Sequence, residues 1–309
     1  MLTRGAIFCQ NLPANLLAAP AYNNINCRLI SLMPLDIASL NSGSNGNCYY
    51  VGNDKEAVLV DAGLSCRETE KRMKRLGLSM HLVKAIFISH EHADHIHGLE
   101  VLSKKYQLPV YITPNTLQNG RLVLNKDQVY AFSPHLPVAI GQLRITAFPK
   151  YHDASDPYSF VISDGHLTIG VFTDIGIICD NLIRYFKVCH AAFLESNYDV
   201  KMLLEGSYPA YLKKRITGGM GHLSNDQALE LFTRHRPTFM SHLLLAHLSK
   251  NNNDPDLVRS LFTPHAKETK IIIATRYEET PVYCIDSAQF AVLDNATQAL
   301  PFGRQLKLF

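Results

Sequence analysis

Four side chains that can bind a metal ion stand within six consecutive residues: His90, His92, Asp94 and His95. They follow the apolar segment Lys84–Ile88, which predicts a strand, so they emerge at its carboxyl end, where open α/β sheets place their sites. His90 and His92 are two residues apart in an extended segment and point to one side. Asp94 and His95 begin a predicted helix and point to a second position. Imidazole nitrogen and carboxylate oxygen suit zinc, manganese or iron, and the asymmetric arrangement predicts a site for two metal ions.

One histidine after a strand is usually a hydrogen-bonding residue, but this density of ligand types is typical of a metal site. The order HxHxDH at residues 90–95 resembles the signature of the metallo-β-lactamase superfamily. That family has an αββα sandwich fold, which holds up to two metal ions between the edges of its two sheets. Its other ligands have counterparts here, each after a predicted strand, namely His152, Asp174 and His247.

The resemblance implies two sets of three ligands and one shared ligand. The first metal ion would be held by His90, His92 and His152, and the second by Asp94, His95 and His247. Asp174 would bridge the two ions. Zinc is the expected metal, with manganese or iron as alternatives.

Five further segments are similar to the YycJ (WalJ) group of this superfamily. They lie at residues 39–48, 61–64, 151–154, 221–225 and 245–249, and the similarity extends over about residues 35–285. The group is regarded as DNA exonuclease-like and resembles ribonuclease Z and other phosphodiesterases. One position departs from the group's pattern, because Tyr198 stands where a histidine is usual.

Two metal ions would supply a bridging hydroxide as the nucleophile, so no serine or cysteine nucleophile is required. The leaving oxygen needs a group that carries a proton near neutral pH. His222 is the candidate, because in ribonuclease Z a histidine in a similar segment, coupled to an upstream glutamate, has this role. Glu195 occupies the corresponding place, and Asp94 is expected to serve catalysis as well as metal binding. The alternative is that His222 only precedes a helix capped by Ser224 or Asn225.

Basic residues bear on the substrate. The helix predicted from Ser65 to about Arg75 carries several, and Lys213–Arg215 follow a second helix. Such runs are usually solvated helix faces, and a groove for the phosphate backbone is less favoured because no aromatic residues are interleaved to stack on bases. The glycine-rich loop Asn41–Asn47 either offers backbone N–H groups to a phosphate or is a plain turn.

Three classes of function are compatible with this site. A phosphodiesterase, specifically an exonuclease acting on DNA, is favoured by the pair of His222 and Glu195. Hydrolysis of a thioester or another small carbonyl substrate, as in glyoxalase II-like relatives with the same seven ligands, is the enzymatic alternative. A redox or non-catalytic metal protein is the third class, which the full ligand set and the lack of a recognisable flavin-binding domain disfavour.

Composition narrows the setting in which this chemistry takes place. The 309-residue chain carries a net charge of +3, which is too small to indicate a nucleic-acid partner by itself. Its 47% hydrophobic and 18% charged residues exclude the disordered and membrane-spanning classes. The seven cysteines include no CxxC pair, so neither a disulfide framework nor a thiolate metal site is indicated, and a reducing cytoplasm is expected.

Short strands that alternate with amphipathic helices must position these residues, which is typical of a layered α/β domain. Strands are predicted at residues 35–40, 48–51, 57–60, 84–88, 110–112, 128–132, 143–148, 158–162, 168–172, 191–194, 239–246, 271–274 and 282–285. Helices are predicted at residues 65–75, 94–106, 181–186, 208–214, 225–233 and 255–261.

One hydrolase domain, residues 33–286, contains all of these elements and every expected ligand. Residues 1–32 show neither helical nor strand periodicity, so they are expected to form an irregular extension, and Met33 is a candidate for the true start. Residues 287–309 form a C-terminal tail without a clear pattern.

Overall fold

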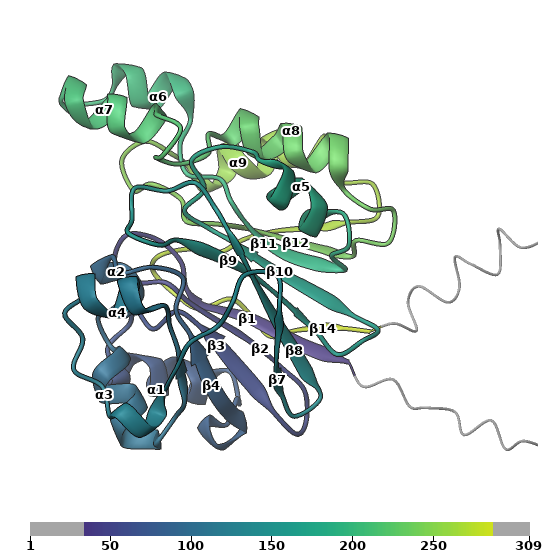
Figure 1. The fold of residues 1–309 in the computed structure, drawn as a ribbon. Helices are drawn as coiled ribbons and strands as arrows, with labels where there is room; N and C mark the ends of the chain where they lie inside the picture. Colours follow the sequence, from purple (N-terminus) through teal and green to yellow (C-terminus); the bar gives the residue numbers. More distant parts are fainter. Residues whose placement is uncertain (1–33, 287–309) are drawn as a thin grey trace, which may run out of the picture. The chain divides into compact units, whose positions relative to one another are not determined.

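The computed structural model describes residues 34–286. The expected extension at residues 1–32 and the tail at residues 287–309 lie outside the described residues. Within the described part, fourteen strands form two seven-stranded sheets (Figure 1).

The first sheet has the strand order β14-β1-β2-β3-β4-β5-β6. Its strands are β1 (Leu35–Asn41), β2 (Cys48–Gly52), β3 (Ala57–Val60), β4 (Val83–Phe87), β5 (Val110–Tyr111), β6 (Val129–Tyr130) and β14 (Tyr283–Ile285). Neighbours from β14 to β3 are antiparallel, and neighbours from β3 to β6 are parallel. Parallel neighbours need crossover connections, and helices α1 to α4 provide them.

The second sheet has the order β13-β12-β11-β10-β9-β8-β7. Its strands are β7 (Pro137–Ile140), β8 (Leu143–Pro149), β9 (Tyr158–Ser163), β10 (Thr168–Phe172), β11 (Ala191–Glu195), β12 (His242–Ala246) and β13 (Lys270–Ile273). Strands β7 to β10 are antiparallel neighbours, and β10 to β13 are parallel. The carboxyl ends of β8, β10, β11 and β12 therefore lie along one edge of this sheet.

Nine α-helices and three short 3-10 helices connect the described strands. The helices are α1 (Cys66–Arg75), α2 (Ala93–Ile96), α3 (Leu99–Tyr106), α4 (Pro114–Asn119), α5 (Asp180–Phe186), α6 (Val200–Glu205), α7 (Ala210–Thr217), α8 (Asn225–His235), α9 (Pro255–Phe262), η1 (Met80–Leu82), η2 (Lys126–Gln128) and η3 (Thr263–His265). Ser65 caps α1 as predicted, since its side chain accepts from the N–H of Glu68. Ser224 and Gln227 form a capping box at the start of α8.

Three apolar layers hold the sheets and helices together. The inner faces of the two sheets meet in a buried core, in which Tyr49 contacts Phe193 and Phe87 contacts Phe160 across the sheets. A second layer packs α1 and α3 on the outer face of the first sheet, and a third packs α5, α8 and α9 on the second (Figure 1). The predicted αββα sandwich is thus confirmed.

Several predicted elements need correction. The single helix expected over residues 94–106 is two helices, α2 and α3, separated at Gly98. A Cβ atom at Gly98 would lie 1.8 Å from the carbonyl oxygen of Leu64, so only glycine allows this close approach of two backbones. Strand β7 and helices α4 and α6 were not predicted.

Every helix within residues 34–286 is too short or too polar to span a membrane.

Candidate metal centre

The carboxyl ends of strands from both sheets deliver the predicted site residues to one place. His90 and His92 follow β4, and α2 carries Asp94 and His95. From the second sheet, His152 follows β8, Asp174 follows β10 and His247 follows β12, while Glu195 ends β11. The seven expected ligands, which are up to 157 residues apart in the chain (247 − 90), are thereby brought together.

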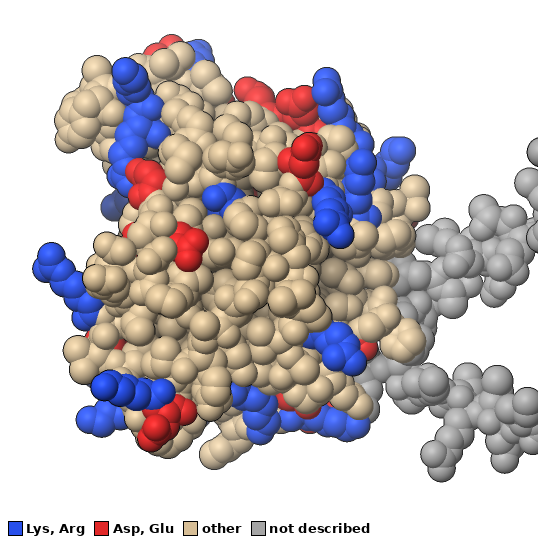
Figure 2. All heavy atoms as spheres, in the orientation of Figure 1, with Lys and Arg blue, Asp and Glu red and all other residues tan. Residues whose placement is uncertain are grey.

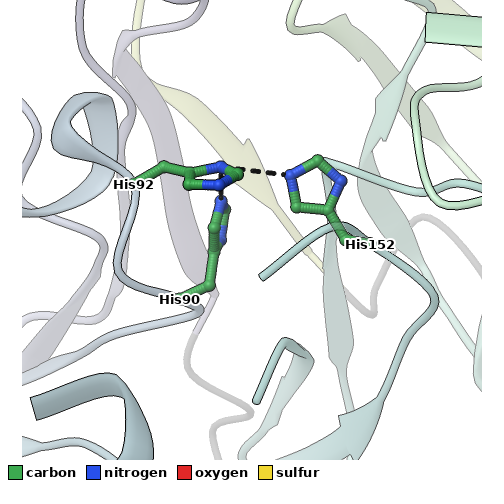
Figure 3. Close-up of side chains that lie close together, drawn as sticks. All are labelled: His90, His92 and His152. Atoms are coloured by element: carbon green, nitrogen blue, oxygen red, sulfur yellow. Dashed lines mark hydrogen bonds between the residues drawn. The ribbon is translucent and has the colours of Figure 1, made fainter. Parts of the chain in front are cut away.

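Three histidines form the first set of candidate ligands. His92 Nδ1 lies 3.0 Å from His90 Nε2 and 3.3 Å from His152 Nε2. Figure 3 shows the three rings converging on one point from the two sheets. Their nitrogen atoms all lie within 4.8 Å of one another, as metal ligands do. His90 and His152 are buried, whereas His92 is half-buried.

Asp94, His95 and His247 form the second set. The Oδ2 atom of Asp94 lies 3.6 Å from Nε2 of His95 and 3.6 Å from Nε2 of His247. Burial opposes ionisation of Asp94, yet the charge of His95 lowers its pKa to about 2, so it is a carboxylate at neutral pH. A carboxylate and two imidazoles are a common ligand set for a divalent transition metal.

Asp174 lies between the two sets. Its Oδ2 atom is 3.2 Å from His95 Nε2, and its Oδ1 atom is 3.8 Å from His152 Nε2 and 3.4 Å from His247 Nδ1. Asp174 Oδ1 is thus within 4 Å of a histidine of the first set, and Asp174 Oδ2 is within 4 Å of a histidine of the second set. No other carboxylate of the described residues contacts both sets in this way. This position suits a ligand shared by two ions.

Two buried atoms give an independent sign that this donor set fits a metal. His247 Nε2 and Asp174 Oδ2 are buried without a hydrogen-bond partner, because the 3.2 Å contact of Asp174 Oδ2 with His95 Nε2 lacks hydrogen-bond geometry. A buried polar atom without a partner costs about 1–3 kcal/mol, and a bound cation would remove that cost. Asp61, Asp174 and His247 also have positive φ values of 62°, 56° and 55°. Left-handed backbone at non-glycine residues is strained and clusters at functional sites.

A second layer of hydrogen bonds orients the imidazoles. His95 Nδ1 donates to Asp61 Oδ2 at 2.7 Å, and His152 Nδ1 donates to the carbonyl oxygen of Gly221 at 3.0 Å. Ser89 Oγ donates to Asp61 at 2.9 Å and therefore accepts from Nδ1 of His90 at 2.9 Å. Each interaction fixes a proton on Nδ1 and leaves Nε2 free to bind a cation.

Sequence reasoning missed the roles of Asp61 and Ser89. Asp61 follows β3, and its carboxylate also accepts from the N–H of Ser89 at 2.8 Å. Both residues lie at strand ends directly before or beside the histidine segment. That placement was the available signal, but a serine or aspartate at a strand end is usually a turn or cap residue.

The pKa values of the histidines differ between the two sets. Burial lowers the pKa of His90 well below its usual range and that of His152 to about 3, so both are neutral, the form that binds metals. Burial has the same tendency at His95 and His247, but the charge of Asp174 and other nearby carboxylates raises both pKa values, that of His247 to about 10. Protons therefore compete with metal ions for His95 and His247.

Glu195 contacts two histidines at once. Its Oε1 atom accepts from Nδ1 of His222 at 2.8 Å and from Nδ1 of His247 at 2.9 Å. Its Oε2 atom accepts from the N–H groups of Ile175 and Leu223. Burial opposes ionisation of Glu195, yet the charge of His222 and the bonds from His222 and His247 lower its pKa to about 2. The expected pairing with His222 is present, and the contact with His247 was not foreseen.

His222 is positioned beside the ligands rather than used as a helix cap. Its side chain is 19% exposed, and Nδ1 lies 3.9 Å from Asp174 Oδ1. Ser224 caps α8 with its own side chain, so the helix does not need His222. Tyr198, which departs from the group's pattern, is buried and pairs with Ser224 through a short β-bridge.

The loop Asn41–Asn47 is a structural turn. Its Gly43 N–H donates to Asn47 Oδ1, Gly46 N–H donates to Gly43 O, and Asn47 N–H donates to Asp94 O. These groups are therefore not available to a phosphate. Asn47 instead contacts the metal centre, because its Nδ2 donates to Asp94 Oδ2 at 3.1 Å.

The basic cluster on α1 is also largely structural. Arg72 is buried and donates to the carbonyl oxygens of Leu40 and Tyr277. Arg75 forms an ion pair with Glu279. This helix therefore offers less free positive charge than its sequence indicates.

Comparison with known proteins identifies the family. The profile of the beta-lactamase superfamily domain matches residues 56–247, more than half of the chain. The chain belongs to this superfamily. As a member of it, the chain is a metal-dependent hydrolase, as the family resemblance implied.

Relatives within the beta-lactamase superfamily support the closer resemblance. Exodeoxyribonuclease YycJ of Bacillus anthracis is 37% identical over 230 residues, which are 74% of this chain and 87% of the relative. Exodeoxyribonuclease WalJ of Streptococcus pneumoniae is 33% identical over 223 residues, which are 71% and 83% of the two chains. The similarity to the YycJ (WalJ) group is thus confirmed.

A solved structure shows the same fold. The metallo-beta-lactamase fold protein YhfI from Bacillus subtilis superposes with a TM-score of 0.63 at 19% identity, covering 80% of this chain and 99% of that chain. At this identity the comparison concerns the fold alone.

Proposed function

We propose that this protein is a binuclear metal-dependent exonuclease that hydrolyses phosphodiester bonds of DNA. The names of its relatives YycJ and WalJ support a DNA substrate. The observation that carries the phosphodiester assignment is the pair of His222 and Glu195 beside the ligand sets, because an alkoxide leaving group needs a proton donor there.

Seven residues would hold two divalent ions, with zinc the first candidate and manganese or iron the alternatives. The first ion would bind His90, His92 and His152, and the second would bind Asp94, His95 and His247. Asp174 would bind both ions. When bound, the pair of cations supplies Lewis acidity, which acidifies water and stabilises charge on the phosphoryl oxygens. Asp61, Ser89 and Glu195 hold the ligating rings in place.

His222 would protonate the leaving oxygen. Its Nδ1–H is held by the ionised Glu195, so the transferable proton resides on Nε2. The carboxylate also holds the ring in one orientation beside the ligand sets. Asp94 is a metal ligand in this scheme, and its catalytic role follows from that position.

Two predictions about the chain as a whole extend this proposal. We infer that residues 33–286 form the complete hydrolase domain, so a chain that starts at Met33 should keep its activity. A cytoplasmic location stays a prediction from the cysteine pattern.

The test compares a natural DNA substrate with bis-p-nitrophenyl phosphate, whose leaving group needs no proton. His222→Ala should lose roughly 10²- to 10⁴-fold in rate on DNA and far less on the nitrophenyl ester, at equal metal content. Equal losses on both substrates would assign His222 to binding or structure. Parallel assays with RNA and a glutathione thioester cover the alternatives, and thioester hydrolysis without DNA cleavage would refute the proposed function.

A further inference from the structure

Helix α7 presents three residues on one exposed face beside the metal centre. Tyr211, Lys214 and Arg215 have the i, i+3, i+4 spacing that places side chains on the same side of a helix. All three are exposed, and Tyr211 is 76% exposed. The opposite side of the helix is apolar, since Leu212 and Ile216 pack in a small cluster under it. We call Tyr211, Lys214 and Arg215 the α7 face.

The α7 face is tied to the segment that carries a candidate ligand. Arg215 forms an ion pair with Asp153, which directly follows His152. The N–H of Asp153 donates to the carbonyl oxygen of Met220, at 2.9 Å, in the turn after α7. The N–H of His222 donates to the carbonyl oxygen of Ile216 at 3.0 Å. The face therefore borders the metal centre and is fixed relative to it.

Charge and aromatic surface coincide on this side of the centre. Lys214 makes no ion pair with any residue in the described range 34–286, unlike Arg72 and Arg75 of α1. Tyr151, next to His152, is 50% exposed and adds a second aromatic ring at the rim. Figure 2 shows Lys and Arg atoms gathered along the α6–α7 segment at the upper left of the molecule. Tyr211 thus lies among basic residues on this helix, so the expectation that no aromatic residue is interleaved with the basic runs was wrong here.

We propose that the α7 face binds the single-stranded part of the polynucleotide substrate. One base stacks on Tyr211, Lys214 neutralises a backbone phosphate, and Tyr151 offers a second stacking surface nearer the metal centre. Stacking on an exposed tyrosine tolerates every base, and a free lysine adds a contact that is independent of sequence. This inference rests on the proposed nuclease function and specifies how its substrate is held.

The test measures binding without cleavage. Full-length protein is treated with EDTA and titrated into a labelled twelve-nucleotide oligothymidylate, with oligouridylate as a parallel probe, and fluorescence anisotropy gives Kd. Tyr211→Ala should weaken binding by about 5- to 150-fold, the effect of losing one base–aromatic stack. Lys214→Ala should reduce the slope of log K against log salt by about 0.7. Tyr211→Phe and Lys214→Arg should bind nearly as well as the parent.

Matched controls come from strand β6 of the first sheet and from helix α3, which packs on that sheet. Tyr130→Ala removes an exposed tyrosine from β6, and Lys104→Ala removes an exposed lysine from α3; neither should change Kd or the salt slope. Melting temperature and circular dichroism verify that the α7 variants are folded. If the parent binds and cleaves DNA but the Tyr211 and Lys214 variants match it, the α7 face is wrong and the nuclease function stands. If the metal-loaded parent cleaves neither DNA nor RNA, the proposed function fails and this inference with it.

Discussion

The two halves of the metal centre are built differently. The first-sheet half takes His90, His92, Asp94 and His95 from one segment, and its orienting groups Asp61 and Ser89 lie close by on neighbouring strand ends. The second-sheet half takes three ligands from three strand ends, and one buried carboxylate, Glu195, ties a ligand to the candidate acid. Under the proposed function, the second half would couple metal binding to proton transfer through Glu195, whereas the first half has no contact of this kind with His222.

Substitution of Asp174 should weaken metal binding in both halves of the metal centre at once. Asp174→Ala removes the carboxylate that lies within 4 Å of both sets, so the protein should lose most of its activity and bind both ions weakly. Metal content after dialysis, measured by mass spectrometry, checks this expectation. Two tightly retained ions in the variant would contradict the shared-ligand assignment.

Paired substitutions in the orienting layer should separate the halves. Asp61→Asn should weaken metal binding by roughly 10- to 100-fold, while leaving the substrate preference of the metal-saturated enzyme unchanged. Glu195→Gln should weaken metal binding by a similar factor and also reduce DNA cleavage more than cleavage of the nitrophenyl ester, because it disturbs His222 as well as His247. Identical behaviour of the two variants at metal saturation would show that the halves are not distinct.

Proton release on metal binding should distinguish the neutral from the protonated histidines. His247, whose pKa is raised to about 10, is protonated at pH 8 in the metal-free protein, as is His95, whereas His152, with a pKa of about 3, is not. Metal affinity should therefore rise by about ten-fold per pH unit for each proton released, until pH passes the raised pKa values. Calorimetry in buffers of different ionisation enthalpy counts these protons, and none released at pH 8 would contradict the electrostatic account.

The same shift sets a direction for stability. The pKa of His247 is raised from 6.5 to about 10, so protonated His247 stabilises the folded metal-free protein fully below pH 6.5. This stabilisation is lost as the pH rises towards 10. Bound metal should remove this alkaline loss. Thermal melting of the metal-free and metal-loaded proteins across this range tests both statements.

A glycine pair should sharpen the comparison at the level of packing. Gly98→Ala forces a Cβ against the Leu64 carbonyl oxygen, so it should cost roughly 1–3 kcal/mol of stability. Gly219→Ala, in the turn before His222, meets only the Cγ2 atom of Ile177, at 3.3 Å, and should change the melting temperature little. Equal melting temperatures for the two variants would show that the first-sheet half tolerates backbone adjustment.

Features that depend only on neighbouring residues could be predicted from the sequence, and features that depend on distant residues could not. The segment at residues 90–95 was readable because strand and helix geometry place those four side chains without help from the rest of the fold. His152, Asp174 and His247 were found by order and by resemblance, since each alone is an ordinary strand-end residue. The break at Gly98 was missed because helical periodicity continues through it, and only the contact with Leu64 forbids a continuous helix.

The hydrogen-bond partners and the free charges were decided by the tertiary structure. His95 and Asp61 are 34 residues apart, and His247 and Glu195 are 52 residues apart, so no local pattern records these pairings. The fold class, the types of candidate ligand and the metal-dependent chemistry were predictable from the sequence, because these depend on periodicity and on the side chains present. The positive charge that a helix can offer to a substrate depends on contacts with distant residues. Arg72 of α1 is buried, whereas Lys214 of α7 is exposed.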